Sequence, residues 1–171
     1  SDLICEVAKV NPNMVVVLHN GAPVTMPWVN QVKGILELYL AGEAAGEAAV
    51  RLLFGDVNPS GHLAETFPLR VEDTPVYPYY GREKEDIIYR EGLLVGYRYY
   101  GTVKKETLFA FGHGLSYSEF RYSNLQLDRR EMTDCETLHV SVDVENISDR
   151  TGKALVQIYV EPLHGVSVRP V

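Results

Sequence analysis

The stretch that decides the fold is MVVVLHNG, residues 14–21. Met14 to Leu18 is an unbroken apolar run, mostly β-branched, which is typical of a strand buried on both faces of a parallel sheet. Before it, residues 1–10 carry apolar side chains at helical spacing and are followed by the turn Asn11-Pro12-Asn13. The chain is therefore expected to open with a helix that leads into a buried strand.

The segments after this strand continue the alternation. Pro27 suits a first helical position and predicts a short helix, GILELYLAG (34–42) predicts a second strand, and residues 43–54 predict a third helix with Gly55 as its left-handed C-terminal cap. This order is typical of an α/β fold with a mostly parallel sheet. Two strands make too narrow a sheet, so we expect part of the domain to precede the chain.

From residue 55 to residue 114 the periodicity weakens, and prolines, glycines and tyrosines accumulate. Long irregular stretches tend to be functional or to cover other parts of a protein. Two interpretations of the tyrosines are open: they stack on sugars, or they pack against neighbouring segments, and packing is favoured. The tyrosines of this region are Tyr77, Tyr79, Tyr80, Tyr89, Tyr97, Tyr99 and Tyr100, and the sugar-stacking interpretation concerns all of them except Tyr89.

After Tyr117 the pattern becomes that of half-buried antiparallel strands. A strand with an irregularity is expected from Phe120 to Leu127, and strictly alternating strands are expected at 138–144 and 154–160, joined by NISDRTG (146–152). These are the features of a β-sandwich of the immunoglobulin or fibronectin kind, which needs about seven strands. We therefore expect an incomplete antiparallel β-sandwich, with a domain boundary at 114–119.

Composition excludes several classes of function. The net charge of -7, from 16 basic and 23 acidic residues, argues against a nucleic-acid partner. Cys5 and Cys135 stand in no metal-binding spacing and are expected to be free thiols, and no cofactor or metal is expected. We expect no membrane association, since no run reaches the length of a spanning helix and no signal peptide is visible. The compartment stays open, with the cytoplasm favoured by the free thiols.

AFGHGLSYSEF, residues 110–120, contains reactive-looking side chains. Ser116 does not stand in the G-x-S-x-G elbow of a nucleophilic serine, and the glycines beside His113 are explained by unusual backbone angles. A structural turn is therefore favoured over catalysis by either residue. His19 is better placed, because ligands of α/β sheets bind at the carboxyl ends of strands, although a hydrogen-bonded loop histidine is the simpler interpretation.

Other motifs are weak. Gly42 and Gly46 open the third helix and could offer an anion site, but we expect Gly42 to end a strand and Gly46 to allow close helix packing. Asn146-Ile147-Ser148 has the pattern of a glycosylation sequon and is interpreted as a chance match in a turn. Most of the acidic residues are expected to be solvated: Glu43, Glu47 (paired with Arg51), Asp56, Glu65, Asp73, Glu85, Asp86, Glu91 and Glu145.

Read in order, five stretches resemble family 3 glycoside hydrolases of the β-glucosidase type, and they span almost the whole chain. FGDVNPSGHLAETFP (54–68) and FGHGLSYSEF (111–120) are specific as a pair. The five stretches are VVVLHNGAPVTMPW (15–28), LAGEAAGEAAVRLLFGDVNPSGHLAETFP (40–68), YREGLLVGYRYY (89–100), LFAFGHGLSYSEFRYSNL (108–125) and VSVDVENISDRTGKALVQIYV (140–160).

The resemblance implies three regions: residues 1–66 as the later part of an α/β sandwich domain, 67–117 as a connecting region packed on it, and 118–171 as the first strands of a fibronectin type III-like domain. It places the aspartate nucleophile in a barrel domain and the acid/base glutamate before residue 15, so no catalytic residue is assigned to this chain. Glu43 stands where family members commonly have glutamine, which leaves a contact there open.

The resemblance implies a β-glucosidase-like parent enzyme that hydrolyses terminal β-linked sugars by a retaining two-carboxylate mechanism. The expected partners are the remaining domains of that enzyme and its glycoside substrate, and the chain alone is expected to be inactive. The alternative is a non-catalytic carbohydrate-binding or protein-interaction module. Strand edges left unpaired at the domain boundaries also predict self-association.

Overall fold

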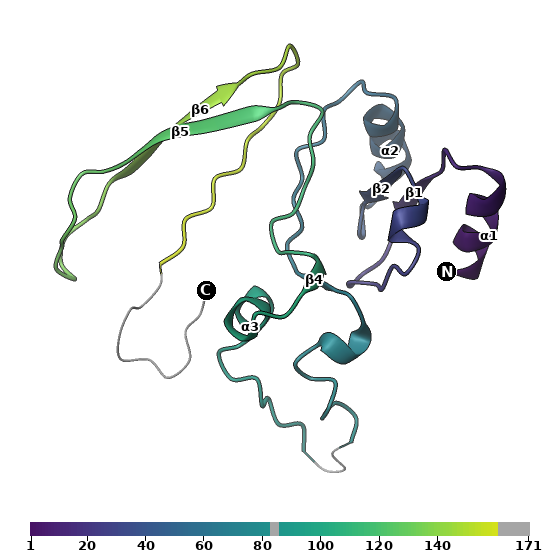
Figure 1. The fold of residues 1–171 in the computed structure, drawn as a ribbon, viewed down its shortest axis with the longest axis horizontal. Helices are drawn as coiled ribbons and strands as arrows, with labels where there is room; N and C mark the ends of the chain where they lie inside the picture. Colours follow the sequence, from purple (N-terminus) through teal and green to yellow (C-terminus); the bar gives the residue numbers. More distant parts are fainter. Residues whose placement is uncertain (83–85, 161–171) are drawn as a thin grey trace.

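The computed structural model describes residues 1–82 and 86–160, in which short helices alternate with three separate two-stranded sheets (Figure 1). The elements, in chain order, are α1 (Asp2–Val10), β1 (Val15–Leu18), the 3-10 helix η1 (Val29–Gln31), β2 (Gly34–Glu37), α2 (Ala45–Leu53), β3 (Phe67–Pro68), the 3-10 helix η2 (Val71–Asp73), α3 (Tyr97–Val103), β4 (Thr107–Phe109), β5 (Phe120–Leu127) and β6 (Val140–Asn146). Glu85 and residues 161–171 lie outside the described residues.

The α/β pattern at the start of the chain is confirmed. β1 and β2 pair in parallel, with Val15 opposite Gly34 and Leu18 opposite Glu37. α1 and α2 stand where helical spacing predicts them. Gly55 follows α2 with a positive φ of 80°, so it supplies the expected left-handed end of that helix.

Three details of this part differ from the sequence prediction. β2 ends at Glu37 and does not run through residues 34–42, because Tyr39 takes a positive φ of 47°, which a strand cannot accommodate. The predicted short helix is reduced to η1, a single 3-10 turn. Val15 is 48% exposed, so β1 is not covered on both faces by the described residues.

The connecting region contains more regular structure than its composition predicts. α3 lies inside it, between Gly96 and Lys104, and Lys104 ends the helix in the left-handed conformation with φ 52°. β3 pairs antiparallel with β4, with Phe67 opposite Phe109. The prediction of an irregular stretch was wrong here, since burial of Tyr100 stabilises a helix whose glycine and β-branched residues favour it poorly.

β5 and β6 form an antiparallel ribbon, called the ribbon below, that extends from the rest of the chain (Figure 1). Its register shifts between Ser123 and Gln126, where Asn124 has a positive φ, and this confirms the expected irregularity. The predicted strand at 154–160 is absent from the described structure. A strand needs a hydrogen-bonded neighbour along its backbone, and this segment is held instead by a bond from the Tyr122 hydroxyl to Leu155 O, at 3.1 Å.

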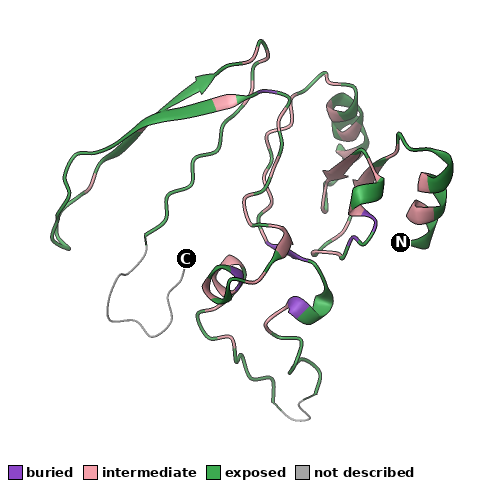
Figure 2. Cartoon of the chain, in the orientation of Figure 1, coloured by how far each residue is buried: buried purple, intermediate pink, exposed green. Residues whose placement is uncertain are grey.

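The core is small and lies under the α/β part. Met26, Trp28 and Phe67 are its buried members, and side chains of α1, β1, β2 and β4 pack around them. Figure 2 shows that most of the ribbon is exposed, with buried positions confined to a few sites. The ring of Phe67 meets those of Tyr39 and Phe109 edge-on, with centroids 6.4 and 6.3 Å apart. Residues far apart in sequence are thereby joined at Phe67.

Asp73 is a buried carboxylate, 4% exposed, that ties η2 to the chain between α3 and β4. It contacts Lys105 at 3.1 Å and Arg70 at 3.4 Å. The hydrogen bond from the Lys105 ammonium holds the pKa of Asp73 below its ordinary value of 3.8; burial opposes this shift and Arg70 adds to it. Asp73 is thus an exception to the expectation that most of the acidic residues are solvated.

We predict that Asp73→Asn destabilises the chain at neutral pH and has little effect in acid. A carboxylate whose folded pKa is lowered contributes stability above its unfolded pKa, and this contribution is lost as the pH falls through the folded value. The difference between the urea midpoints of the wild type and of Asp73→Asn should therefore be largest near neutral pH and shrink as the pH falls below about 4. A difference that does not shrink on acidification would contradict the ionic role.

Candidate functional site

The carboxyl ends of β1 and β2 meet at one edge of their sheet, called the carboxyl edge below. Asn20 follows β1 there, and its Nδ2 donates to Ala22 O at 2.8 Å. Glu37 ends β2, and its Oε1 accepts from the backbone N–H of Tyr39 at 2.8 Å. This is the place where parallel α/β sheets bind ligands, so it is the first location to test for chemistry.

Three oxygens at the carboxyl edge are buried and have no hydrogen-bond partner among the described residues: Asn20 Oδ1, Glu37 Oε2 and Tyr39 Oη. Burial, followed by the negative charges of Glu65 and Glu37, raises the pKa of Tyr39 to about 12. Glu65 lies close enough to act on the hydroxyl electrostatically, although the hydroxyl has no hydrogen bond of standard geometry. The carboxyl edge therefore contains several hydrogen-bond acceptors and carries negative charge.

The chemical capacity of the carboxyl edge is limited. The unpartnered oxygens are buried, so they are closed to a ligand in this structure. Sequence reasoning missed Asn20 and Tyr39, since neither belongs to a motif. His19, the residue that the sequence favoured here, is exposed just after β1, and the prediction that it is hydrogen-bonded gains no support from the described contacts.

The start of α2 does not form an anion site in this structure. Gly42 has a positive φ of 73° and lies in the loop after β2, so its conformation accounts for the glycine. Gly46 lies inside α2, and a Cβ built there meets no atom within 4 Å. The predicted close packing at Gly46 was therefore wrong, and Glu43 is exposed in the preceding loop.

Ser116 and His113 are not arranged as a nucleophile and its base. The Ser116 hydroxyl donates to Asn58 Oδ1 at 3.0 Å and accepts from the backbone N–H of Ser118 at 3.1 Å. The exposed His113 ring stacks on Phe109, with centroids 4.8 Å apart. Both side chains make contacts that fix the turn, which supports the interpretation of residues 110–120 as a structural turn over a catalytic one.

Asn58 is the centre of a hydrogen-bond network that joins three distant segments, called the Asn58 network below. Its Nδ2 donates to Ser118 Oγ at 2.7 Å and to Thr151 O at 2.9 Å, and its Oδ1 accepts from Ser116 and from the Tyr117 N–H. An asparagine amide has two donor hydrogens and one two-lone-pair acceptor, so all of its capacity is used. The partners lie 58 to 93 residues away, and no local pattern indicated them.

The two glycines beside His113 are needed for different reasons. Gly112 has a positive φ of 80°, as the sequence predicted. Gly114 does not; there a Cβ would lie 2.5 Å from Gly61 O, so the position requires close backbone approach. Leu115, the next residue, is 79% exposed. The Tyr117 hydroxyl donates to Leu52 O at 2.9 Å and so joins this turn to α2.

The remaining candidates have structural partners. Glu47 pairs with Arg51 at 3.7 Å, as predicted, and Glu145 pairs with Arg121 across the ribbon at 3.2 Å. Asn146 Oδ1 accepts from the Ser148 N–H and hydroxyl, at 3.0 and 2.6 Å, so the sequon is used to close a turn. Asp56, Asp86 and Glu91 are exposed or partly exposed.

The tyrosines of the connecting region divide into two groups. Tyr97 stacks on Phe111 with centroids 5.0 Å apart, and Tyr99 packs edge-on against Tyr100, which is 7% exposed. These contacts support packing over sugar stacking. The second group is exposed, from 39% to 80%, and comprises Tyr77, Tyr79, Tyr80 and Tyr89.

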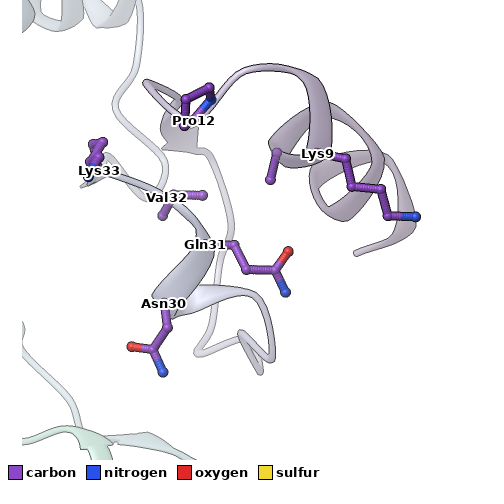
Figure 3. Close-up of a pocket in the computed structure, with 7 residues that line it drawn as sticks. Lys9, Pro12, Asn30, Gln31, Val32 and Lys33 are labelled. Atoms are coloured by element: carbon purple, nitrogen blue, oxygen red, sulfur yellow. The ribbon is translucent and has the colours of Figure 1, made fainter.

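Two surface hollows lie on the described part of the chain. One, of about 380 Å³, lies between the end of α1 and η1 (Figure 3). Figure 3 shows its Lys9 extending away from Gln31, with Lys33 on the opposite side, so the two cations do not converge. The other, of about 290 Å³, is lined by aromatic residues, including Tyr97 and Phe111, together with threonine and lysine side chains. Neither hollow contains a residue that the sequence offered as a nucleophile or an acid/base.

Within residues 1–82 and 86–160, no helix is long and apolar enough to cross a bilayer. No group of three or more His, Cys, Asp or Glu side chains there is arranged to hold a metal ion.

A sequence profile of the glycosyl hydrolase family 3 C-terminal domain matches residues 1–117. Thermostable beta-glucosidase B of Acetivibrio thermocellus is 49% identical over 168 residues, which are 98% of this chain and 22% of that protein. A beta-glucosidase of Rhizobium radiobacter is 42% identical over 176 residues, covering 99% of this chain and 21% of that protein. The chain thus spans about a fifth of the length of the relatives it matches.

Solved structures give the same result. DesR, a beta-glucosidase from Streptomyces venezuelae in complex with D-glucose, superposes with a TM-score of 0.78 at 40% identity, over 88% of this chain and 19% of that one. The GH3 beta-glucosidase of Bifidobacterium adolescentis superposes with a TM-score of 0.80 at 40% identity, over 91% of this chain and 24% of that one.

Proposed function

The chain belongs to glycosyl hydrolase family 3, and we propose that it is part of a β-glucosidase-like enzyme that, when whole, hydrolyses terminal β-linked sugars by a retaining mechanism. The observation that carries this proposal is the 49% identity to a beta-glucosidase over 98% of the chain. In such a mechanism one carboxylate attacks the anomeric carbon, while the other protonates the leaving oxygen and then activates water.

We further propose that neither catalytic carboxylate lies in residues 1–171. The carboxyl groups at the carboxyl edge support this, because Glu37 points an oxygen into a covered position and Glu65 lies beside the Tyr39 hydroxyl. A nucleophile and an acid/base need direct access to the scissile bond. In this proposal residues 1–117 contribute architecture to the parent enzyme, and its reacting groups come from other segments.

The domain organisation is proposed as 1–66 for the α/β part, 67–117 for the connecting region and 118–171 for the start of a fibronectin type III-like domain. The family profile ends at residue 117, next to the second boundary. The antiparallel pairing of β5 with β6 and the turn closed by Asn146 are compatible with a β-sandwich.

The exposed surface supports partners within the parent enzyme. The chain exposes 12940 Å², whereas a compact monomer of this length exposes about 8,400 Å². The excess is much larger than the roughly 800 Å² that each partner buries in a standard interface. We therefore propose that other domains of the parent cover it; in the isolated chain the same surface is open to self-association, which sedimentation would detect.

The activity assay that tests this proposal compares the chain with its parent on an aryl β-glucoside. We expect turnover by the full-length parent and none above the uncatalysed rate by residues 1–171, because both reacting carboxylates are placed elsewhere. An inactive parent would overturn the proposed reaction. Turnover by the isolated chain would overturn the placement of the catalytic groups while leaving the reaction in place.

A further inference from the structure

The C-terminal end of α2 receives hydrogen bonds from two side chains outside the helix and far along the chain. The Tyr117 hydroxyl donates to Leu52 O at 2.9 Å, and the Arg150 guanidinium donates to Gly55 O just beyond the helix. Carbonyls in the last turn of a helix have no partner within it, and their partial negative charge favours a nearby cation. Both contacts therefore act as C-terminal capping groups.

The two capping side chains also hold each other. The Arg150 guanidinium lies over the Tyr117 ring, 5.2 Å from its centroid. Arg150 O in turn accepts from Ser118 Oγ at 2.6 Å, and Ser118 is nine-tenths buried. Ser118 belongs to the Asn58 network, so the capping groups and that network form one connected set of bonds.

Backbone contacts bring the same segments together. The chain after α2 and the chain leading into β5 run side by side (Figure 1), with the Leu63 N–H bonded to His113 O and the Gly112 N–H bonded to Leu63 O, both at 2.8 Å. Gly152 lies against this network, since a Cβ there would be 2.8 Å from both Asn58 Nδ2 and Ser118 Oγ. The position of the ribbon relative to α2 is thus fixed by these backbone hydrogen bonds and by the close approach at Gly152.

We propose that the residues flanking the ribbon, Tyr117 before β5 and Arg150 after β6, form the C-terminal cap of α2, so that the last turn of the helix and the Asn58 network open and close as one unit. α2 starts after the loop at the carboxyl edge and ends at this network, so the helix links the edge to the ribbon. Tyr117 and Arg150 are positioning residues in this device. The inference concerns the conformational coupling of the chain and does not depend on the proposed glycosidase activity.

Hydrogen exchange of the 171-residue chain, followed by mass spectrometry, tests the coupling. We expect Arg150→Ala to raise exchange of the amides at 51–55 about tenfold, because a charge-assisted bond to the helix end is lost. Tyr117→Phe removes one hydroxyl and should raise it about fivefold. Arg121→Ala, which removes an exposed ribbon arginine paired with Glu145, is the matched control and should leave these amides unchanged.

The reverse experiment destabilises α2 and measures amide exchange in the Asn58 network. Ala48→Gly, at an exposed position inside α2, weakens the helix, and reciprocity of coupling requires faster exchange of the Tyr117 and Ser118 amides. Unchanged exchange at 51–55 in both capping variants would overturn the proposal. So would an equal rise throughout the chain, including β1, because that reports global destabilisation.

Discussion

Phe67→Ala is expected to lower the free energy of unfolding by about 3–5 kcal/mol, the usual cost of removing a fully buried phenylalanine. Phe67 is 1% exposed, and its ring contacts Tyr39 beyond β2 and Phe109 in β4. Alanine leaves a cavity between these elements. Urea titration followed by the fluorescence of Trp28, the single tryptophan, reports directly on this core.

Phe54→Ala is the matched control for Phe67→Ala. Phe54 follows α2 and is 81% exposed, so the same chemical change should alter the free energy of unfolding by less than about 0.5 kcal/mol. Similar effects of the two substitutions would show that the cluster of Met26, Trp28 and Phe67 does not act as the core in solution.

Gly114→Ala is expected to cost about 2–3 kcal/mol, near the upper end for overpacking. The added methyl group would lie 2.5 Å from the backbone oxygen of Gly61 and 2.8 Å from the ring of His62. A backbone oxygen cannot rotate away as a flexible side chain can, so the paired segments must separate. Their hydrogen bonds, between Leu63 and residues 112–113, would weaken with them.

Gly46→Ala provides the opposite result for the same chemical change. A Cβ at Gly46 meets no atom within 4 Å, and glycine inside a helix is less favourable than alanine. We expect a gain of about 0.5–1 kcal/mol. In thermal unfolding, Gly46→Ala should therefore melt above the wild type and Gly114→Ala below it. An unchanged melting temperature for Gly114→Ala would show that close backbone approach does not constrain this position.

The local parts of the fold were predictable because each depends on a few neighbouring residues. The apolar run Met14 to Leu18 predicted β1, helical spacing predicted α2, and alternation predicted β5 and β6. Gly55 and Gly112 were recognised as positions of unusual backbone angle, which the positive φ of 80° at each of them confirms. α3 was missed because burial of Tyr100 stabilises it, and burial depends on what surrounds the helix.

The candidate site was predictable only in its location. The order of strands and loops indicated the carboxyl edge, but the side chain expected there, His19, is exposed, whereas Asn20, Glu37 and Tyr39 carry the buried oxygens. A left-handed Tyr39 has no signature in the neighbouring residues, and its raised pKa depends on Glu65, which comes from a different segment.

By itself, the sequence determined the alternation of helices and strands, the parallel pairing at the start of the chain, the ribbon near its end and the family to which the chain belongs. Only the tertiary structure decided which residues join these parts. Asn58 and Arg150 stand in unremarkable turns, and their bonds cross 60 and 95 residues. Local periodicity reflects the contacts of a residue with its own element, whereas bonds between distant segments exist only after the backbone has brought them together.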